Sequence, residues 1–172
     1  MRITREHLAY PMLCFVLGLT LASLPSCSDN ETGHIYSTWD TMEADKFASA
    51  WLIKRFVDKD AEFEFYPVGQ PIPEGIPFDT PDAEIRRYHN MATFEFVLQK
   101  YGIEDEYLRT MADTMHELEI ISWQRELTPE AKQVDRSIKA IVQSSESPEA
   151  CLAECMRYFD GYYNDLKQPH QD

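Results

Sequence analysis

Residues 40–58 carry apolar side chains at the spacing of an amphipathic helix. One face of this helix holds Ala48, Leu52 and Phe56, with Trp51 beside them. The polar side chains of Glu43, Lys46 and Lys54 fall on the other side. Asp40 can cap the first backbone amides, and Glu43 three residues later completes the pattern of a capping box. The pattern predicts a helix that begins at Asp40 and ends near Asp58, with the rest of the chain organised around it.

One acidic residue interrupts the apolar face of this helix. Asp45 lies in line with Leu52 and Phe56. A carboxylate aimed at a core is costly unless a cation, a metal ion or several hydrogen-bond donors lie beside it. Arg55 lies roughly 80° round the same helix and can reach that side. Asp45 is therefore a candidate metal ligand, and Arg55 is a candidate for an ion pair with it or for contact with an anion.

Short strands are predicted on either side of this helix. Residues 35–39 have the β-branched and aromatic content of a strand, and residues 62–66 alternate strictly, with Phe63 and Phe65 on one face. We expect the two strands to pair in one small sheet with the helix on one face. Residues 67–81 hold five of the ten prolines, which excludes a helix or a central strand. Two interpretations stay open for them, a plain connecting loop and a wall over a binding site.

Helical periodicity dominates the remainder of the chain. Helices are expected to begin at Thr93, at about Asp105 (running to about Ile121), at Pro129 and at Pro148. The last two carry regular apolar faces and are interpreted as scaffold. The predicted fold class is therefore α+β, a mostly helical single domain with a small β-sheet. It spans residues 35–166 and is followed by a tail, residues 167–172.

A second carboxylate is predicted to point inward. Glu119 falls among the apolar residues of its helix, and His116 three residues earlier lies on the rim of the same face. Together with Asp45, and with Glu84 and His89 from the intervening segment, these side chains can supply mixed nitrogen and oxygen ligands. Such ligands suit a divalent metal ion such as zinc, manganese or iron. A structural polar network, in which Asp45 pairs with Arg55, Arg86 or Arg87, and an acid–base catalytic site are the other interpretations of the same residues.

Residues 1–26 are typical of a lipoprotein-type signal peptide. Basic residues precede an apolar run that is too short for a stable membrane span. The motif LPSC at residues 24–27 is similar to a bacterial lipobox, whose chemistry is thioether lipidation of Cys27. Residues 27–34 would then form a polar tether. We expect an exported protein, a periplasmic or cell-surface lipoprotein anchored in the membrane, with a soluble secreted or periplasmic product as the alternative.

Composition limits the range of partners. The 172 residues include 16 Lys and Arg against 30 Asp and Glu, for a formal net charge of −14. This excludes nucleic acid as a partner, because its binders need a basic face. It also disfavours passive electrostatic gathering of an oxyanion, so an anion would need a local cluster of Arg or His.

Two of the four cysteines belong to the domain. Cys14 lies in the signal peptide and Cys27 at its cleavage site. Cys151 and Cys155 stand four residues apart on a predicted helix, a geometry that suits a disulfide poorly. Three roles stay open for this pair: small buried hydrophobes, a disulfide, and a metal or redox pair.

The first helix also carries a family resemblance. The run DKFASAWLIKRFVD, from Asp45 to Asp58, resembles the signature of the C-terminal domain of ChrB-type chromate resistance proteins. Further matching positions are Ala61, Phe63, Phe78, Asp79, Glu84, His89, Phe94, Tyr101, Asp105 and the run HELE at residues 116–119. The resemblance covers residues 36–122 well and implies a role in resisting chromate. All five candidate metal ligands lie at matching positions.

These features favour an exported, lipid-anchored chromate resistance protein that binds or senses a metal ion or an oxyanion. A metal-dependent enzyme, either a chromate reductase or a hydrolase, is one alternative, although no nucleotide-binding fingerprint is present to supply electrons. A non-catalytic partner module for a transporter or a regulator is the other. Full-length ChrB proteins resemble this domain with an extra N-terminal region. An export signal stands there in this chain, so a DNA-regulatory role in the cytoplasm is not expected.

Overall fold

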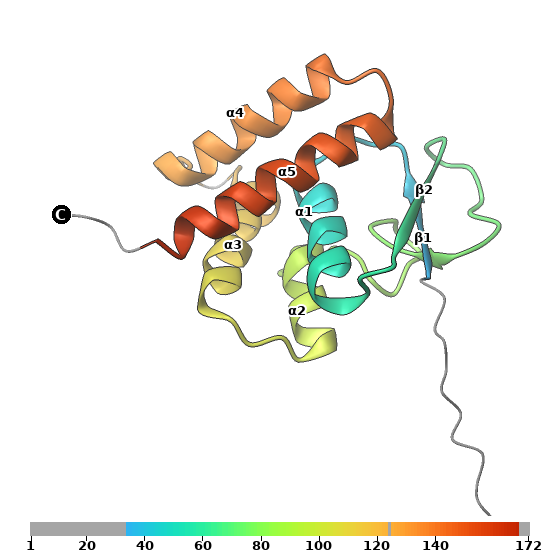
Figure 1. The fold of residues 1–172 in the computed structure, drawn as a ribbon, viewed down its shortest axis with the longest axis horizontal. Coiled ribbons are helices and arrows are strands. Elements are labelled where there is room, and N and C mark those ends of the chain that lie inside the picture. Colours follow the sequence, from blue (N-terminus) through green and yellow to red (C-terminus); the bar gives the residue numbers. More distant parts are fainter. Residues whose placement is uncertain (1–33, 124, 169–172) are drawn as a thin grey trace, which may run out of the picture. The chain divides into compact units, whose positions relative to one another are not determined.

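The computed structural model describes residues 34–123 and 125–168, and Figure 1 shows how their helices and strands are arranged. The strands are β1 (Ile35–Trp39), β2 (Glu62–Tyr66) and β3 (Ile76–Pro77). The helices are α1 (Ala44–Leu52), α2 (Thr93–Tyr101), α3 (Glu106–His116), α4 (Pro129–Ser144) and α5 (Pro148–Leu166). α1 and α3 each continue into a π-helical turn, η1 (Ile53–Val57) and η2 (Glu117–Ile121). The predicted α+β fold, mostly helical with a small sheet, is confirmed.

The sheet is parallel, with strand order β2-β1-β3. Parallel neighbours need a crossover, and α1 with η1 supplies it between β1 and β2. The predicted pairing of residues 35–39 with residues 62–66 is confirmed, in the register that sets Tyr36 opposite Phe63. The proline-rich segment also contributes β3, a two-residue edge strand that the sequence did not predict. Proline is tolerated there because an edge strand does not need every N–H group.

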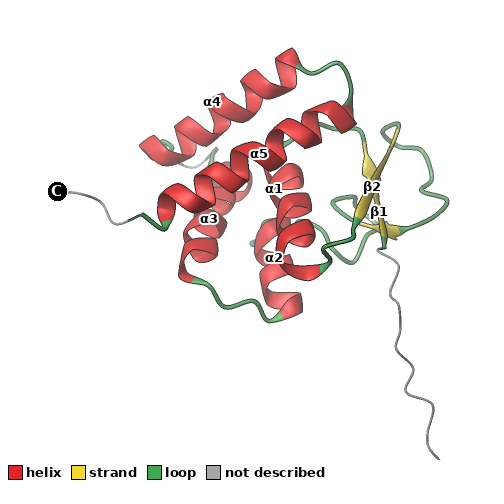
Figure 2. Cartoon of the chain, in the orientation of Figure 1, coloured by secondary structure: helices red, strands yellow, loops and turns green. Residues whose placement is uncertain are grey.

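α1 is the centre of the helical layer. It contacts α2, α3, α4 and α5, and every residue from Asp45 to Leu52 is buried. The helices gather on one side of the sheet, and α5 runs across α1 (Figure 2). Because α1 is covered on all sides, it has no solvent-facing polar stripe.

The predicted start of this helix is wrong by one turn. Asp40 continues the strand instead, since its N–H donates to the Tyr66 carbonyl over 2.8 Å. Its carboxylate accepts the Val68 N–H over 3.1 Å rather than capping a helix. The residue before α1 is Glu43, which makes no side-chain cap. The predicted end near Asp58 is confirmed.

The cysteines of the domain lie in the core. Cys151 and Cys155 are both buried and free, with no disulfide between them. Burial raises the pKa of both thiols, which keeps them protonated and weakly nucleophilic.

The predicted signal peptide, Cys27 and nearly all of the tether fall outside the described residues, as does the end of the tail. None of the helices within residues 34–123 and 125–168 is long and apolar enough to cross a bilayer.

Candidate functional site

Asp45 faces inward, as predicted, and its carboxylate holds the start of another helix. It is 2% exposed and accepts the backbone N–H groups of Thr93 (2.6 Å) and Phe94 (3.0 Å). These are the first amides of α2, which have no partner within that helix. Ser49 Oγ lies 3.5 Å from the same carboxylate. Asp45 is thus a cap supplied from α1 to the N-terminus of α2.

Burial has a large effect on this carboxylate. It raises the pKa of Asp45 from 3.8 to about 7, and the negative charge of Asp79 adds to the rise. The amides of α2 act in the opposite direction because they bind the ionised form. Asp45 therefore changes charge near neutral pH.

Lys46, the next residue, is 1% exposed. Its ammonium donates to the Trp39 carbonyl over 2.8 Å and to the Thr41 hydroxyl, and lies 3.7 Å from the Asp79 carboxylate. Burial lowers the pKa of Lys46, and the charge of Asp79 opposes this effect. Helical periodicity had placed Lys46 on a polar side of the helix. That prediction is wrong because α1 is enclosed by other elements.

Asp79 joins this network from the proline-rich segment. Its backbone has a φ of 50°, in the left-handed region that aspartate tolerates better than most residues. Its carboxylate accepts the Thr93 hydroxyl over 2.6 Å, so Thr93 bridges Asp79 and Asp45. Burial raises the pKa of Asp79, and the nearby ammonium of Lys46 offsets part of that rise.

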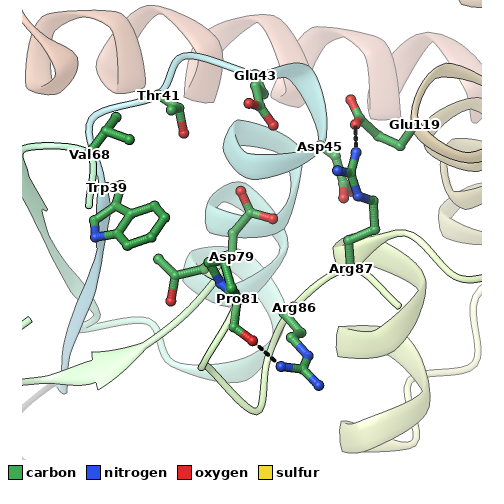
Figure 3. Close-up of a pocket in the computed structure, with 11 residues that line it drawn as sticks. Trp39, Thr41, Glu43, Asp45, Val68, Asp79, Pro81, Arg86, Arg87 and Glu119 are labelled. Carbon is green, nitrogen blue, oxygen red and sulfur yellow. Dashed lines mark hydrogen bonds and ion pairs between the residues drawn. The ribbon is translucent and has the colours of Figure 1, made fainter. Parts of the chain in front are cut away.

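A cavity of about 350 Å³ lies over these residues. Figure 3 shows side chains from the end of β1, the start of α1, the segment after β3 and η2 converging on it. Its lining comprises Trp39, Thr41, Glu43, Asp45, Val68, Asp79, Thr80, Pro81, Arg86, Arg87 and Glu119. The proline-rich segment therefore forms one wall of this cavity, through Val68, Asp79, Thr80 and Pro81.

Negative charge predominates in this pocket. Four carboxylates line it, those of Glu43, Asp45, Asp79 and Glu119. Arg87 pairs with Glu119 at 2.7 Å, whereas the guanidinium of Arg86 turns away to the Pro81 carbonyl (Figure 3). Burial raises the pKa of Glu119, and the charge of Glu43 adds to that rise. The carboxylates thus repel one another, which favours a positively charged occupant.

Glu119 lies on the π-helical turn η2 and lines the pocket. Glu117, two residues earlier, instead accepts the N–H of Thr128 (3.0 Å) and its hydroxyl (2.6 Å). Thr128 in turn caps α4. Two acids of one π-helical turn thus serve different purposes, and such turns are frequent at functional sites.

The structure separates the five predicted metal ligands. Asp45 and Glu119 line the same pocket, but Glu84 is exposed and pairs with Lys100 at 2.7 Å, and His89 is exposed. His116 contacts Glu95 at 2.8 Å. Within the described ranges, no three His, Cys, Asp or Glu side chains come together closely enough to hold a metal ion.

Arg55 lies away from Asp45. Its guanidinium makes two bonds to Asp160 of α5, of 2.8 and 2.7 Å, and the Trp51 indole N–H donates to the same carboxylate. Arg55 therefore ties the end of the central helix to α5.

Spacing along the sequence does not select several residues that line the pocket or lie beneath it. Lys46 and Asp79 have no periodicity or spacing that distinguishes them, although both stand at positions that the family resemblance matched. Glu43 was interpreted only as part of a cap, and Arg87 only as a possible ion-pair partner. Asp79 and Arg87 join the residues around α1 only through the tertiary fold, because they come from segments that are distant from α1 in sequence.

Comparison with known proteins and protein families identifies the family to which this chain belongs. The family described as "ChrB, C-terminal domain" matches residues 36–166. "Protein ChrB" of Cupriavidus metallidurans is 25% identical over 143 residues, which cover 81% of this chain and 43% of that relative. The chain thus spans less than half the length of the curated relative it matches, and no solved structure matches it. The match over residues 36–166 shows that this chain belongs to the ChrB C-terminal domain family.

Proposed function

We propose that this chain acts in chromate resistance, the role that ChrB family membership implies, by binding or sensing a cation in the acidic pocket. One observation supports a cation, rather than an anion, as the ligand of this pocket. Asp45, Asp79 and Glu119 each have a pKa raised by burial and raised further by the charge of another pocket carboxylate. A bound cation would remove this repulsion, whereas an oxyanion would add to it.

The geometry also constrains the form of the cation. A metal ion bound directly needs several ligands at roughly 2.0–2.6 Å. The pocket carboxylates are spread around about 350 Å³ instead. The metal interpretation that fits this arrangement is a hydrated ion, held through its own water molecules as magnesium commonly is.

The predicted export belongs to the same proposal. Residues 1–26 would direct the chain out of the cytoplasm, and lipidated Cys27 would hold it at a membrane. The pocket would then meet its ligand in the periplasm or at the cell surface.

The proposal is tested by calorimetric titration with hexaamminecobalt(III), a compact trivalent cation that keeps its ligand shell. We expect it to bind, and chromate not to bind. Asp79→Asn and Glu119→Gln should each weaken binding about tenfold, because each removes one pocket charge. Asparagine tolerates the left-handed backbone and still accepts the Thr93 hydroxyl. Glu84→Gln, at an exposed carboxylate outside the pocket, is the control. Chromate binding without cation binding would refute the proposal.

An enzymatic role is the second candidate. A buried carboxyl with a pKa of about 7, as Asp45 has, suits general acid–base catalysis at neutral pH. Turnover of chromate with a reductant that is lost in Asp45→Asn, while the hexaamminecobalt(III) affinity persists, would favour an enzyme over a binding protein.

A further inference from the structure

A second cavity adjoins the acidic pocket. Its volume is about 400 Å³, and Glu43 and Glu119 line both cavities. These two carboxylates therefore stand at the junction between the two spaces. Figure 3 shows both at the edge of the acidic pocket, Glu43 before α1 and Glu119 on η2.

The walls of the second cavity differ in character from those of the first. Half of the lining residues are apolar, and they come from the segment that leads into α1, from η2 and its following loop, and from α4: Met42, Ala44, Leu118, Leu127, Ile138 and Val142. Ser122 and Gln143 add two uncharged polar side chains. The charged residues Asp135 and Lys139 also line it, but they pair with each other at 2.7 Å. Their charges are already compensated, so the cavity favours an apolar occupant.

One of the two carboxylates at the junction, that of Glu43, is not compensated by an ion pair among the described residues. Among the described residues, the Glu43 carboxylate accepts no hydrogen bond and forms no ion pair, and Glu119 meets only Arg87. Trp39 lines the acidic pocket on the side away from Glu119, with its indole ring toward the interior (Figure 3). An aromatic face beside carboxylates is a favourable setting for an organic cation.

We propose that the two cavities form one cleft for a small organic cation that carries an apolar chain. The charged end binds between Glu43 and Glu119, and the chain lies against Leu118, Ile138 and Val142. This ligand class rests on the proposed function, because the same carboxylates bind the charge. It extends that function by adding an apolar recognition element, which a hydrated metal ion would leave unused.

The experiment is a calorimetric titration of the full-length chain, without detergent, with ethyl-, butyl-, hexyl- and octylammonium. Affinity should rise with each added methylene, by up to about fourfold where the group is fully buried, which corresponds to ~0.8 kcal/mol. Hexanoate and hexanol, which have no positive charge, should bind at least tenfold more weakly than hexylammonium.

Two substitutions test separately how the protein recognises the charged end and the apolar chain of the ligand. Glu43→Gln should weaken every member of the series by the same factor. Val142→Thr keeps the shape of its side chain but makes the second cavity more polar, so it should flatten the dependence on chain length. Val68→Thr, which makes the same change in the acidic pocket, is the matched control and should keep the dependence.

The outcomes distinguish this inference from the proposed function. One outcome is that hexaamminecobalt(III) binds while the affinity for alkylammonium ions does not depend on chain length. That result would refute the role of the second cavity in binding the apolar chain, but it would still support the acidic pocket as a cation site. Absence of binding by either class of cation would refute both. Equal binding of hexanol and hexylammonium would overturn the inference as well, because it would show an apolar groove with no recognition of charge.

Discussion

The substitution Asp45→Asn tests the electrostatic account of the central helix. Asp45 is buried, and its pKa is raised from 3.8 to about 7 in the folded protein. Each pH unit between these values corresponds to about 1.36 kcal/mol, so the group contributes up to ~4 kcal/mol of pH-dependent stability. Asparagine has a similar shape but does not titrate.

The direction of the effect follows from the proton balance. Between pH 4 and pH 7, the folded state keeps a proton on Asp45 that the unfolded state has released. The stabilising contribution is therefore fully present below the unfolded pKa, and it is lost as the pH rises through about 7. Ser49 Oγ, at 3.5 Å, is the neighbouring atom that can accept the proton of the neutral form.

The assay is urea unfolding of the wild type and Asp45→Asn at several pH values from 5.5 to 8, above the sequence pI of about 4.7. As the pH rises through this range, the free energy of unfolding of the wild type should fall by about 2 kcal/mol relative to that of the variant. The exposed substitution Glu84→Gln should follow the wild type at every pH.

A difference that stays constant across this range, or that grows with pH, would refute the reasoning. It would show that the amides of Thr93 and Phe94 outweigh burial and keep Asp45 ionised.

Three further substitutions test other parts of the account. Lys46→Met should cost about 3 kcal/mol in urea unfolding, because it leaves the largely buried Asp79 carboxylate without its counter-charge; a loss below 1 kcal/mol would contradict the role assigned to Lys46. Arg55→Ala should cost about 1 kcal/mol or less, since Arg55 and Asp160 are 41% and 39% exposed. Cys27→Ser should move the protein from the membrane fraction to the soluble fraction, as measured by immunoblot of fractionated cells; an unchanged distribution would refute lipid anchoring.

Periodicity predicted much of the fold because the helices α2 to α5 each have one apolar face. It also identified Asp45 and Glu119 as inward carboxylates, because each interrupts a regular apolar stripe. These predictions depend only on local spacing, which the chain retains in the folded protein.

The contacts of the site could not be predicted in the same way. Asp45 binds amides that lie 48 and 49 residues away, and no local signal marks that partnership. Lys46 was assigned to a polar face that α1 does not have, since other elements enclose the helix. The change from α-helix to the π-helical turn η2 at Glu117 is likewise not indicated by the spacing of apolar residues.

The central claim is that the pocket carboxylates bind a cation. It is tested most directly by titrating hexaamminecobalt(III) into the protein at pH 6 in two buffers with different ionisation enthalpies. Because burial and mutual repulsion raise the pKa values of Asp45, Asp79 and Glu119, a cation should release protons as it binds. The account predicts saturable binding with net proton release that decreases in Asp79→Asn. Absence of binding, or binding accompanied by proton uptake, would contradict it.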